Sequence, residues 1–212
     1  MQEMVRCSEI ELKRKEDKDK KDKDSEGFGK RLLQARVIMI SETITDKLAR
    51  DVTAQCILMQ EEDALAPITV YINSPGGSAD SGFAIFDILR FITPPVRTIC
   101  IGLCASAAVL IYLAAKKENR YSLLNCRFLL HQPSTTLFGT ASDIEINANE
   151  IIKLKERYNR IVSQETGKPV EQINRDADRD FWLSAEEAKD YGLVGKIIQS
   201  HSEIPTPAKT EK

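Results

Sequence analysis

The chain has 212 residues, of which 42% are hydrophobic and 29% charged, a composition typical of a soluble globular protein with room for one sizeable core. Thirty basic residues against 32 acidic ones leave a formal charge of -2, so no global positive field favours nucleic acid or an anionic membrane as a partner. We therefore expect one domain with loose ends.

Mixed charge dominates the stretch from Lys13 to Glu26, where seven basic and six acidic residues leave only Ser25 uncharged. Such a stretch cannot bury itself, so we expect a flexible charged segment over 1–27. The alternative is a charged loop that gates an opening or touches a partner. At the other end, a polar stretch with two prolines predicts a flexible tail over 199–212, which leaves 28–198 as the folded domain.

Cysteine usage and the first residues both bear on location. The five cysteines are odd in number and include no Cys-x-x-Cys pair, which favours a reducing compartment. The opening residues contain no apolar segment followed by a small-residue cleavage site, as a secretory signal would. We expect a cytoplasmic protein.

Strand and helix patterns alternate through the predicted domain. The expected strands are Arg36–Ile40, Ile68–Asn73, Val96–Ile101 and Cys126–Leu130, and the expected helices between them are Ile44–Glu61, Ser78–Ile92 and Ala105–Ala115. Strands joined through helices need crossover connections, so the sequence predicts an α/β fold with a mainly parallel sheet. The uncharged run Ile99–Ala115 is just short of a membrane span, and a buried strand followed by a buried helix is the favoured interpretation.

Two capping boxes predict later helices. Ser142 with Glu145 opens a long helix that Gly167 ends, and Ser184 with Glu187 opens a short helix. The long helix is charged but keeps a broad apolar stripe, so we expect it to pack against another element or a second subunit.

Two histidines are present, His131 and His201, and the second falls in the predicted tail. A histidine base would therefore be His131, at the end of an apolar strand, although a single histidine in that place is more often structural. A predicted strand is followed by a turn through Gly102, and the next predicted helix begins near Ser106. A helix N-terminus stabilises developing negative charge, but a helix-capping serine is the alternative.

Two further features suggest catalytic groups. The glycine pair in YINSPGGS at 71–78 joins a strand to a helix and exposes backbone amides that can bind an oxyanion, or serves only as a flexible turn. An acidic string runs from Arg175 to Asp180, and one of its carboxylates can orient an imidazole.

Five separated motifs follow one another along the chain: YINSPGGS at 71–78, ASA at 105–107, HQPS at 131–134, SDIEI at 142–146 and RDFWLSAEEAKDYGLV at 179–194. In this order and spacing they resemble the ClpP family of self-compartmentalising serine peptidases. The resemblance covers about 28 to 198. It implies a crotonase-like fold with a parallel sheet, crossover helices and a protruding handle helix from Ser142.

The resemblance also implies the site. Ser106 would be the nucleophile, His131 the general base and Asp180 the carboxylate that holds the imidazole, with the amides of Gly77 and Ala107 as oxyanion donors. No metal or cofactor is implied for the subunit.

Assembly and partners follow from the same resemblance. Two seven-membered rings would stack, with Arg179 coupling ring contact to the triad, and an AAA+ unfoldase would deliver unfolded polypeptides. The segment Gln132–Ala141 would be a strand that lines the substrate groove and pairs with the peptide. The resemblance implies neither nucleic acid nor membrane as a partner.

This chain departs from the family pattern in three places. The family string GQAASMG is GLCASAA here, so the small Ala107 is expected to reshape the pocket beside the nucleophile. In the ATPase-docking cleft, Tyr71 and Phe91 are kept but Thr69 replaces a common aromatic, which suggests weaker docking. The charged segment before Gly27 leaves the gating of the pore open.

The alternatives come from two other classes. One is a ring subunit that is weakly active or silent alone and needs a paralogous partner to align its triad. The other is an acyl-CoA enzyme on the same fold, which the glycine turn alone would favour and the complete triad disfavours.

Overall fold

The computed structural model describes residues 27–134 and 136–205. Its contacts divide the chain into two compact units, Met1–Val37 and Ile38–Lys212. Of the first unit, residues 27–37 are described and 27–34 are helical. The charged stretch Lys13–Glu26 and the end of the predicted tail lie outside the described residues, and the following paragraphs concern the second unit.

A seven-stranded sheet forms the centre of the second unit, in the order β1-β2-β3-β4-β7, with β5 pairing to both β3 and β6. The strands are β1 (Val37–Ile40), β2 (Ile68–Ser74), β3 (Val96–Ala105), β4 (Arg120–Ser122), β5 (Arg127–Leu130), β6 (Phe181–Ser184) and β7 (Lys196–Ile197). The pairs of β3 with β2, β4 and β5 are parallel, as is β4 with β7, whereas β6 runs antiparallel to β5. The predicted, mainly parallel α/β sheet is confirmed.

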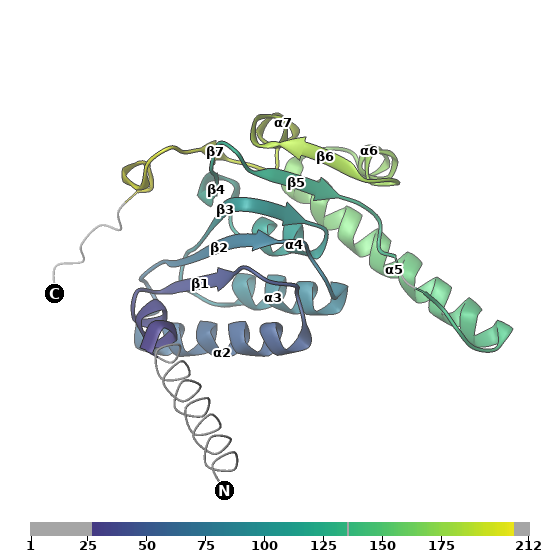
Figure 1. Ribbon diagram of the computed structural model, residues 1–212, viewed down its shortest axis with the longest axis horizontal. Helices are drawn as coiled ribbons and strands as arrows, with labels where there is room; N and C mark the ends of the chain where they lie inside the picture. Colours follow the sequence, from purple (N-terminus) through teal and green to yellow (C-terminus); the bar gives the residue numbers. More distant parts are fainter. Residues whose placement is uncertain (1–26, 135, 206–212) are drawn as a thin grey trace, which may run out of the picture. The chain divides into compact units, whose positions relative to one another are not determined.

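Helices connect the strands, and some of them form a layer on one face of the sheet. They are α2 (Asp46–Glu62), α3 (Ala79–Phe91), α4 (Ala107–Leu113), α5 (Ala141–Thr166), α6 (Val170–Asp176) and α7 (Ala185–Tyr191), with the 3-10 turns η1 (Lys117–Asn119) and η2 (His201–Glu203). Figure 1 shows α2, α3 and α4 side by side beneath the strands, while α5 extends away from the sheet. The alternate β2 residues Ile68, Val70 and Ile72 are fully buried, which is the two-residue period expected for a strand with one face against the helical layer.

Strand β3 is longer than the sequence predicts because Gly102 does not form a turn. The register shifts between Ile72 and Ser74 of β2, and the extra β3 residues are accommodated by an irregularity at that point. A Cβ on Gly102 would lie 2.5 Å from Asn73 Oδ1, and this oxygen accepts a hydrogen bond from Leu103 N–H at 2.9 Å. A bulge of this kind bends the strand, so β3 pairs first with β4 and then with β5.

The long helix starts one residue before the predicted capping box. Thr140 is the N-cap, and its side chain accepts a hydrogen bond from Asp143 N–H, so the prediction of Ser142 as the cap is wrong. The predicted end is confirmed, since Gly167 has a φ of 77°, the left-handed conformation that glycine adopts without strain. The capping box at Ser184 is also confirmed.

Two segments differ from their predicted structure: the strand implied over 132–141 and the start of the tail predicted to be flexible. The strand implied over 132–141 is irregular at 132–134 and 136–140, because a β-ladder needs a partner and no described strand lies against this segment. After β7, residues 201–203 form η2 and Ile204 is buried in a cluster with Ile99, Tyr121 and Ile198.

The described cysteines Cys56, Cys100, Cys104 and Cys126 are buried free thiols. Burial raises the pKa of Cys56 to about 12, so this thiol stays protonated at neutral pH. Among the described helices, none is both long and apolar enough to cross a membrane.

Candidate active site

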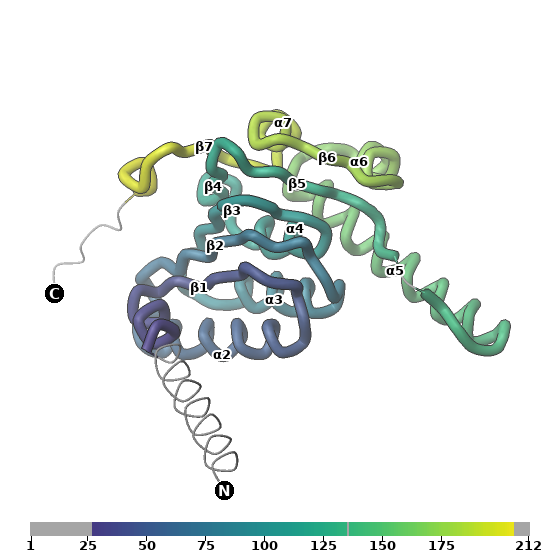
Figure 2. Tube along the Cα trace, in the orientation of Figure 1, coloured from purple at the N-terminus to yellow at the C-terminus, as the bar shows by residue number. Residues whose placement is uncertain are grey.

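The ends of β3 and β5 and the start of β6 lie at one edge of the sheet and bring the predicted triad together. Ser106 directly follows β3, and His131 directly follows the parallel strand β5. Because β6 runs antiparallel to β5, the residue before β6, Asp180, lies at the same edge. Figure 2 follows the chain from β5 through α5 and α6 and back to β6 beside β5. The topology therefore converts a separation of 49 residues between His131 and Asp180 into proximity.

Ser106 is held in a strained backbone conformation between β3 and α4. Its φ is 56° and its ψ -124°, values that non-glycine residues rarely adopt. Ser106 N–H donates to Leu129 O at 2.9 Å, which ties the serine to the strand that carries His131. A Cβ on Gly76 would lie 2.7 Å from the Ser106 Cβ, so only glycine permits this approach.

His131 and Asp180 are in contact, with His131 Nδ1 at 3.4 Å from Asp180 Oδ1. This separation is longer than a normal charge-assisted hydrogen bond. The Asp180 side chain is 64% exposed and that of His131 27% exposed, so solvent screens the contact. The carboxylate can orient the imidazole through Nδ1 and leave Nε2 for the pocket.

Two backbone amides beside Ser106 are available to an anion. Among the described residues, neither Gly77 N–H nor Ala107 N–H donates a hydrogen bond to another group of the protein. Gly77 has a φ of 150° and is bound to Ile44 as an isolated bridge, where a Cβ would collide with Ile44 O. Ala107 is the first residue of α4, whose N-terminus carries positive partial charge. The predicted oxyanion donors thus flank the predicted nucleophile.

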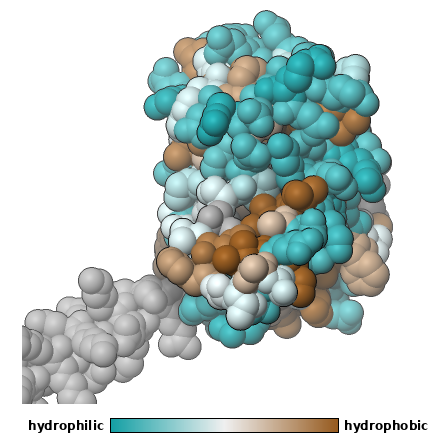
Figure 3. Space-filling view, turned by 90° about the vertical axis from the view of Figure 1, so that its right-hand side faces the viewer, coloured by the Kyte–Doolittle hydropathy of each residue, from teal (hydrophilic) through white to brown (hydrophobic). Residues whose placement is uncertain are grey.

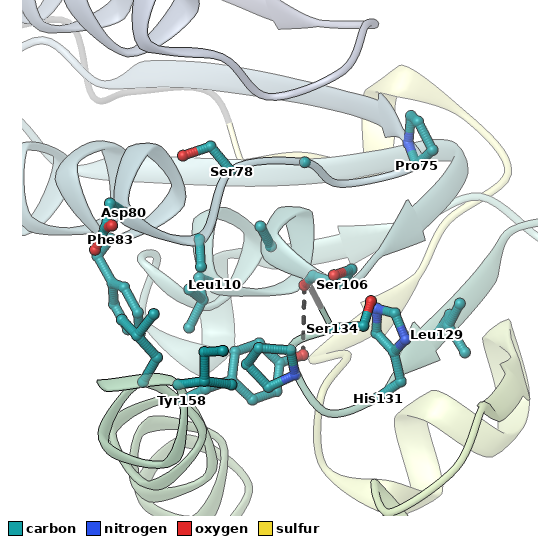
Figure 4. A pocket seen from close by; sticks show the side chains of 16 residues that line it. Pro75, Ser78, Asp80, Phe83, Ser106, Leu110, Leu129, His131, Ser134 and Tyr158 are labelled. Atoms are coloured by element: carbon teal, nitrogen blue, oxygen red, sulfur yellow. Dashed lines mark hydrogen bonds between the residues drawn. The ribbon is translucent and has the colours of Figure 1, made fainter. Parts of the chain in front are cut away.

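A pocket of about 490 Å³ opens beside Ser106 at the carboxyl ends of the strands. Figure 3 looks onto this side of the molecule and shows apolar residues gathered around a recess. In Figure 4, Ser106 and His131 lie at one end of the pocket, whereas Asp80 and Phe83 lie at the other. The pocket is lined by residues of three helices and of the segments at the ends of three strands: Pro75, Gly77, Ser78, Ala79, Asp80, Phe83, Ser106, Ala107, Leu110, Leu129, His131, Pro133, Ser134, Ile151, Leu154 and Tyr158.

Helix α5 supplies one wall of this pocket. Tyr158 is buried, and its hydroxyl donates a long hydrogen bond of 3.4 Å to the carbonyl oxygen of Ser106 (Figure 4). Burial raises the pKa of Tyr158, so its hydroxyl remains a donor. Arg157 lies over the Phe83 ring, with Cζ at 3.6 Å from the ring centroid, and its Nη2 is 3.9 Å from Asp80 Oδ1. These contacts join α5 to α3, and no local sequence pattern indicates them.

The remaining predicted residues are not brought into this pocket. Arg179 is exposed next to Asp180. Thr69 and Tyr71 are partly buried on β2, and Tyr71 lines a separate cavity of about 120 Å³ with residues of β3 and the segment after β7. Phe91, at the end of α3, is 81% exposed and does not line that cavity. Within the described chain, Thr69, Tyr71 and Phe91 therefore do not form one cleft.

Known proteins resemble this chain over most of its length. A family model described as Clp protease matches residues 20–201. The chain is 52% identical over 178 residues to the ATP-dependent Clp protease proteolytic subunit 2 of Pseudomonas aeruginosa, covering 84% of this chain and 88% of the relative. It is 43% identical over 190 residues to the protein of the same name from Treponema denticola, covering 90% of this chain and 95% of the relative.

A solved structure extends the similarity to the fold. A mutant of ClpP1 from Listeria monocytogenes matches with a TM-score of 0.76 at 44% sequence identity, over 82% of this chain and 98% of that chain. A TM-score of this size over nearly all of that protein means that the strands and helices share their order and arrangement.

Proposed function

The chain belongs to the Clp protease family, and from this membership we propose that it is the serine endopeptidase subunit of a self-compartmentalising protease that hydrolyses unfolded polypeptides to short peptides. The observation that carries the proposal is the contact of His131 Nδ1 with Asp180 Oδ1 at the edge of the pocket that Ser106 lines. This contact leaves the second imidazole nitrogen for the serine.

The chemistry follows the roles of a Ser-His-Asp triad. His131 Nε2 takes the proton of the Ser106 hydroxyl as its oxygen attacks the peptide carbonyl, and Asp180 stabilises the imidazolium through Nδ1. The tetrahedral oxyanion accepts hydrogen bonds from the amides of Gly77 and Ala107. His131 then gives the proton to the leaving amine, which breaks the C–N bond and leaves an acyl-enzyme. Water then attacks the acyl carbon as His131 takes its proton, and the imidazolium gives a proton to Ser106 Oγ as the ester C–O bond breaks and the carboxylic acid product leaves.

The proposal includes the assembly and its partner. The names of the relatives contain the words ATP-dependent and proteolytic subunit, which supports an AAA+ unfoldase as the partner of this chain. Two stacked heptameric rings would enclose the pockets, with Arg179 coupling ring contact to Asp180. Thr69, Tyr71 and Phe91 would form the docking cleft only when neighbouring subunits complete it. The compartment proposed for this particle is the cytoplasm.

One observation favours a second candidate, a subunit that is silent alone and needs a paralogous partner. The Asp180 side chain is 64% exposed and stands 3.4 Å from the imidazole, so the single chain does not enclose the carboxylate. A partner that covers Asp180 would exclude water and strengthen its bond to His131.

Covalent labelling tests the proposed function directly. A serine-directed fluorophosphonate is expected to add one label per subunit, at Ser106, and the same preparation is expected to cleave a short fluorogenic peptide. Intact-mass and peptide-mass measurement identify the labelled serine, and light scattering gives the size of the particle. A particle that neither cleaves nor is labelled contradicts a self-sufficient peptidase and favours the paralogue-dependent subunit.

The small side chain of Ala107 is expected to set the choice of substrate. Ala107 lines the pocket beside Ser106, and methionine at this position would fill part of it. In the Ala107→Met variant we expect kcat/KM for peptides with a large apolar residue before the scissile bond to fall about tenfold relative to peptides with alanine there. Ala54→Met, the same change on the exposed side of α2, is the matched control. Identical peptide preferences in Ala107→Met and wild-type protein contradict this prediction.

A further inference from the structure

We propose that Gln132 and Lys155 are positioning residues that fix His131 against Asp180. The inference rests on the proposed function and adds to it a link between helix α5 and the triad. Neither residue lines the pocket, so both would act through His131 and Asp180 and not on the substrate.

The register of β5 and β6 shows why such a link is needed. The last paired residues are Leu130 and Phe181, and His131 and Asp180 are the next pair along the same register. They therefore stand one step beyond the ladder, where within the described chain no backbone hydrogen bond joins the two segments. Asp180 is also too exposed for packing to hold it. The separation of the two side chains depends on what fixes the loops that carry them.

The Gln132 side chain continues the pairing where the backbone ladder stops. Its Nε2 donates a hydrogen bond of 2.8 Å to the backbone oxygen of Asp178. Gln132 is the residue after His131, and Asp178 lies two residues before Asp180. This hydrogen bond therefore joins the loop after β5 to the loop before β6, next to the contact between His131 and Asp180.

Lys155 of α5 fixes this glutamine and the acidic loop together. Its Nζ donates to Gln132 Oε1 at 3.0 Å and lies 3.8 Å from Asp178 Oδ1. An ammonium group only donates hydrogen bonds, so it holds the amide oxygen of Gln132 toward itself and leaves the amide nitrogen for the Asp178 carbonyl. The Lys155 side chain is 29% exposed, so solvent competes less than at a fully exposed pair.

The three contacts join the loop after β5, the loop before β6 and the side of α5. Movement of α5 relative to the sheet would break the Lys155 contacts first, release the Gln132 amide and let Asp180 move away from His131. Small changes in the position of a catalytic group cost large factors in rate. The clamp of Gln132, Lys155 and Asp178 therefore gives α5 a route to the His131–Asp180 contact, beside the bond from Tyr158 to the Ser106 carbonyl.

Two variants and a matched control test the clamp in the full-length protein. In Lys155→Met and in Gln132→Ala, kcat for a fluorogenic peptide is expected to fall about tenfold with KM unchanged, because the triad is displaced and the pocket is not. Lys155→Arg keeps the charge and the donors and is expected to restore most of kcat. Lys153→Met is the control, since Lys153 lies on the same helix, pairs with Glu150 and is 69% exposed.

Thermal melting and light scattering are measured on each variant so that loss of folding or of assembly is seen separately. A fall in kcat that Lys155→Arg recovers, with melting and particle size like those of wild type, supports the clamp. Unchanged kcat in both variants beside an active wild type overturns the clamp alone, as does a rise in KM at constant kcat. A wild type that neither cleaves nor is labelled overturns the proposed function, and the clamp with it.

Discussion

Substitution of Ser106 by alanine is expected to lower kcat for peptide hydrolysis by about 10⁶-fold. The variant keeps the pocket and both oxyanion amides but has no oxygen to attack the carbonyl. The change removes one atom from a partly exposed side chain, so the fold and KM are expected to stay as in wild type. Steady-state hydrolysis of a fluorogenic peptide measures kcat and KM together.

The triad is also expected to respond as a unit. Adding His131→Ala to Ser106→Ala should cost almost nothing further, because the base has no proton left to remove. Asp180→Asn is expected to lower kcat by about 10⁴-fold, since an amide stabilises the imidazolium poorly and favours the wrong tautomer. Residual activity above about one hundredth of wild type in Ser106→Ala would assign the nucleophile to another residue.

Substitution of Arg120 by methionine is expected to lower the free energy of unfolding by about 3–5 kcal/mol. Arg120, at the start of β4, is fully buried and forms an ion pair with Glu165 of α5. It also donates to the backbone oxygens of Leu113, Ala115 and Glu165 at 3.2, 2.8 and 3.1 Å. Methionine fills a similar volume but leaves the carbonyls of Ala115 and Glu165 and one carboxylate oxygen without this donor, whereas Leu113 O still accepts from Arg90 Nη2 at 3.1 Å.

Burial lowers the pKa of Arg120. The ordinary pKa of arginine lies so far above neutrality that the guanidinium stays charged, so a change of pH near neutrality does not break these contacts and a substitution is needed. Arg90→Met is the control, because Arg90 binds the same carboxylate from a side chain that is 40% exposed and should cost less. Urea unfolding at equal protein concentration compares the variants. Equal losses for the two arginines would mean that burial does not set the cost.

The architecture was predictable because its signals are local. Hydrophobic period, glycine stops and serine caps predicted the long strands and helices, and the two-residue strand period appears in β2. The short elements β4, β6, β7 and α6 escaped prediction, since two to seven residues carry too little periodicity. The prediction of a turn at Gly102 was wrong because of a tertiary contact. A glycine after a strand pattern indicates either a turn or a close approach of another group, and here the Asn73 side chain lies where a Cβ of residue 102 would be.

The candidate site likewise has residues that motifs indicate and contacts that only the folded structure shows. Ser106, His131 and Asp180 could be named from motifs, and the strand ends explain why distant motifs meet. The contacts of Tyr158, Lys155 and Gln132 could not be predicted, because they join α5 to loops at the edge of the sheet and leave no pattern along the chain. Thr69, Tyr71 and Phe91 stay a prediction about neighbouring subunits.

The antiparallel pairing of β5 with β6 makes the placement of His131 and Asp180 independent of the length of the chain between them. Both ends of the long excursion through α5 are anchored at this strand pair, whose register brings the loops of His131 and Asp180 to one edge of the sheet, however long the chain between them. Residues 141–147 at the start of α5 are all exposed, whereas Lys155 and Tyr158 lie further along the helix. Changes in the first turns of α5 are therefore expected to alter the surface of the proposed assembly while His131 and Asp180 stay at the same edge of the sheet.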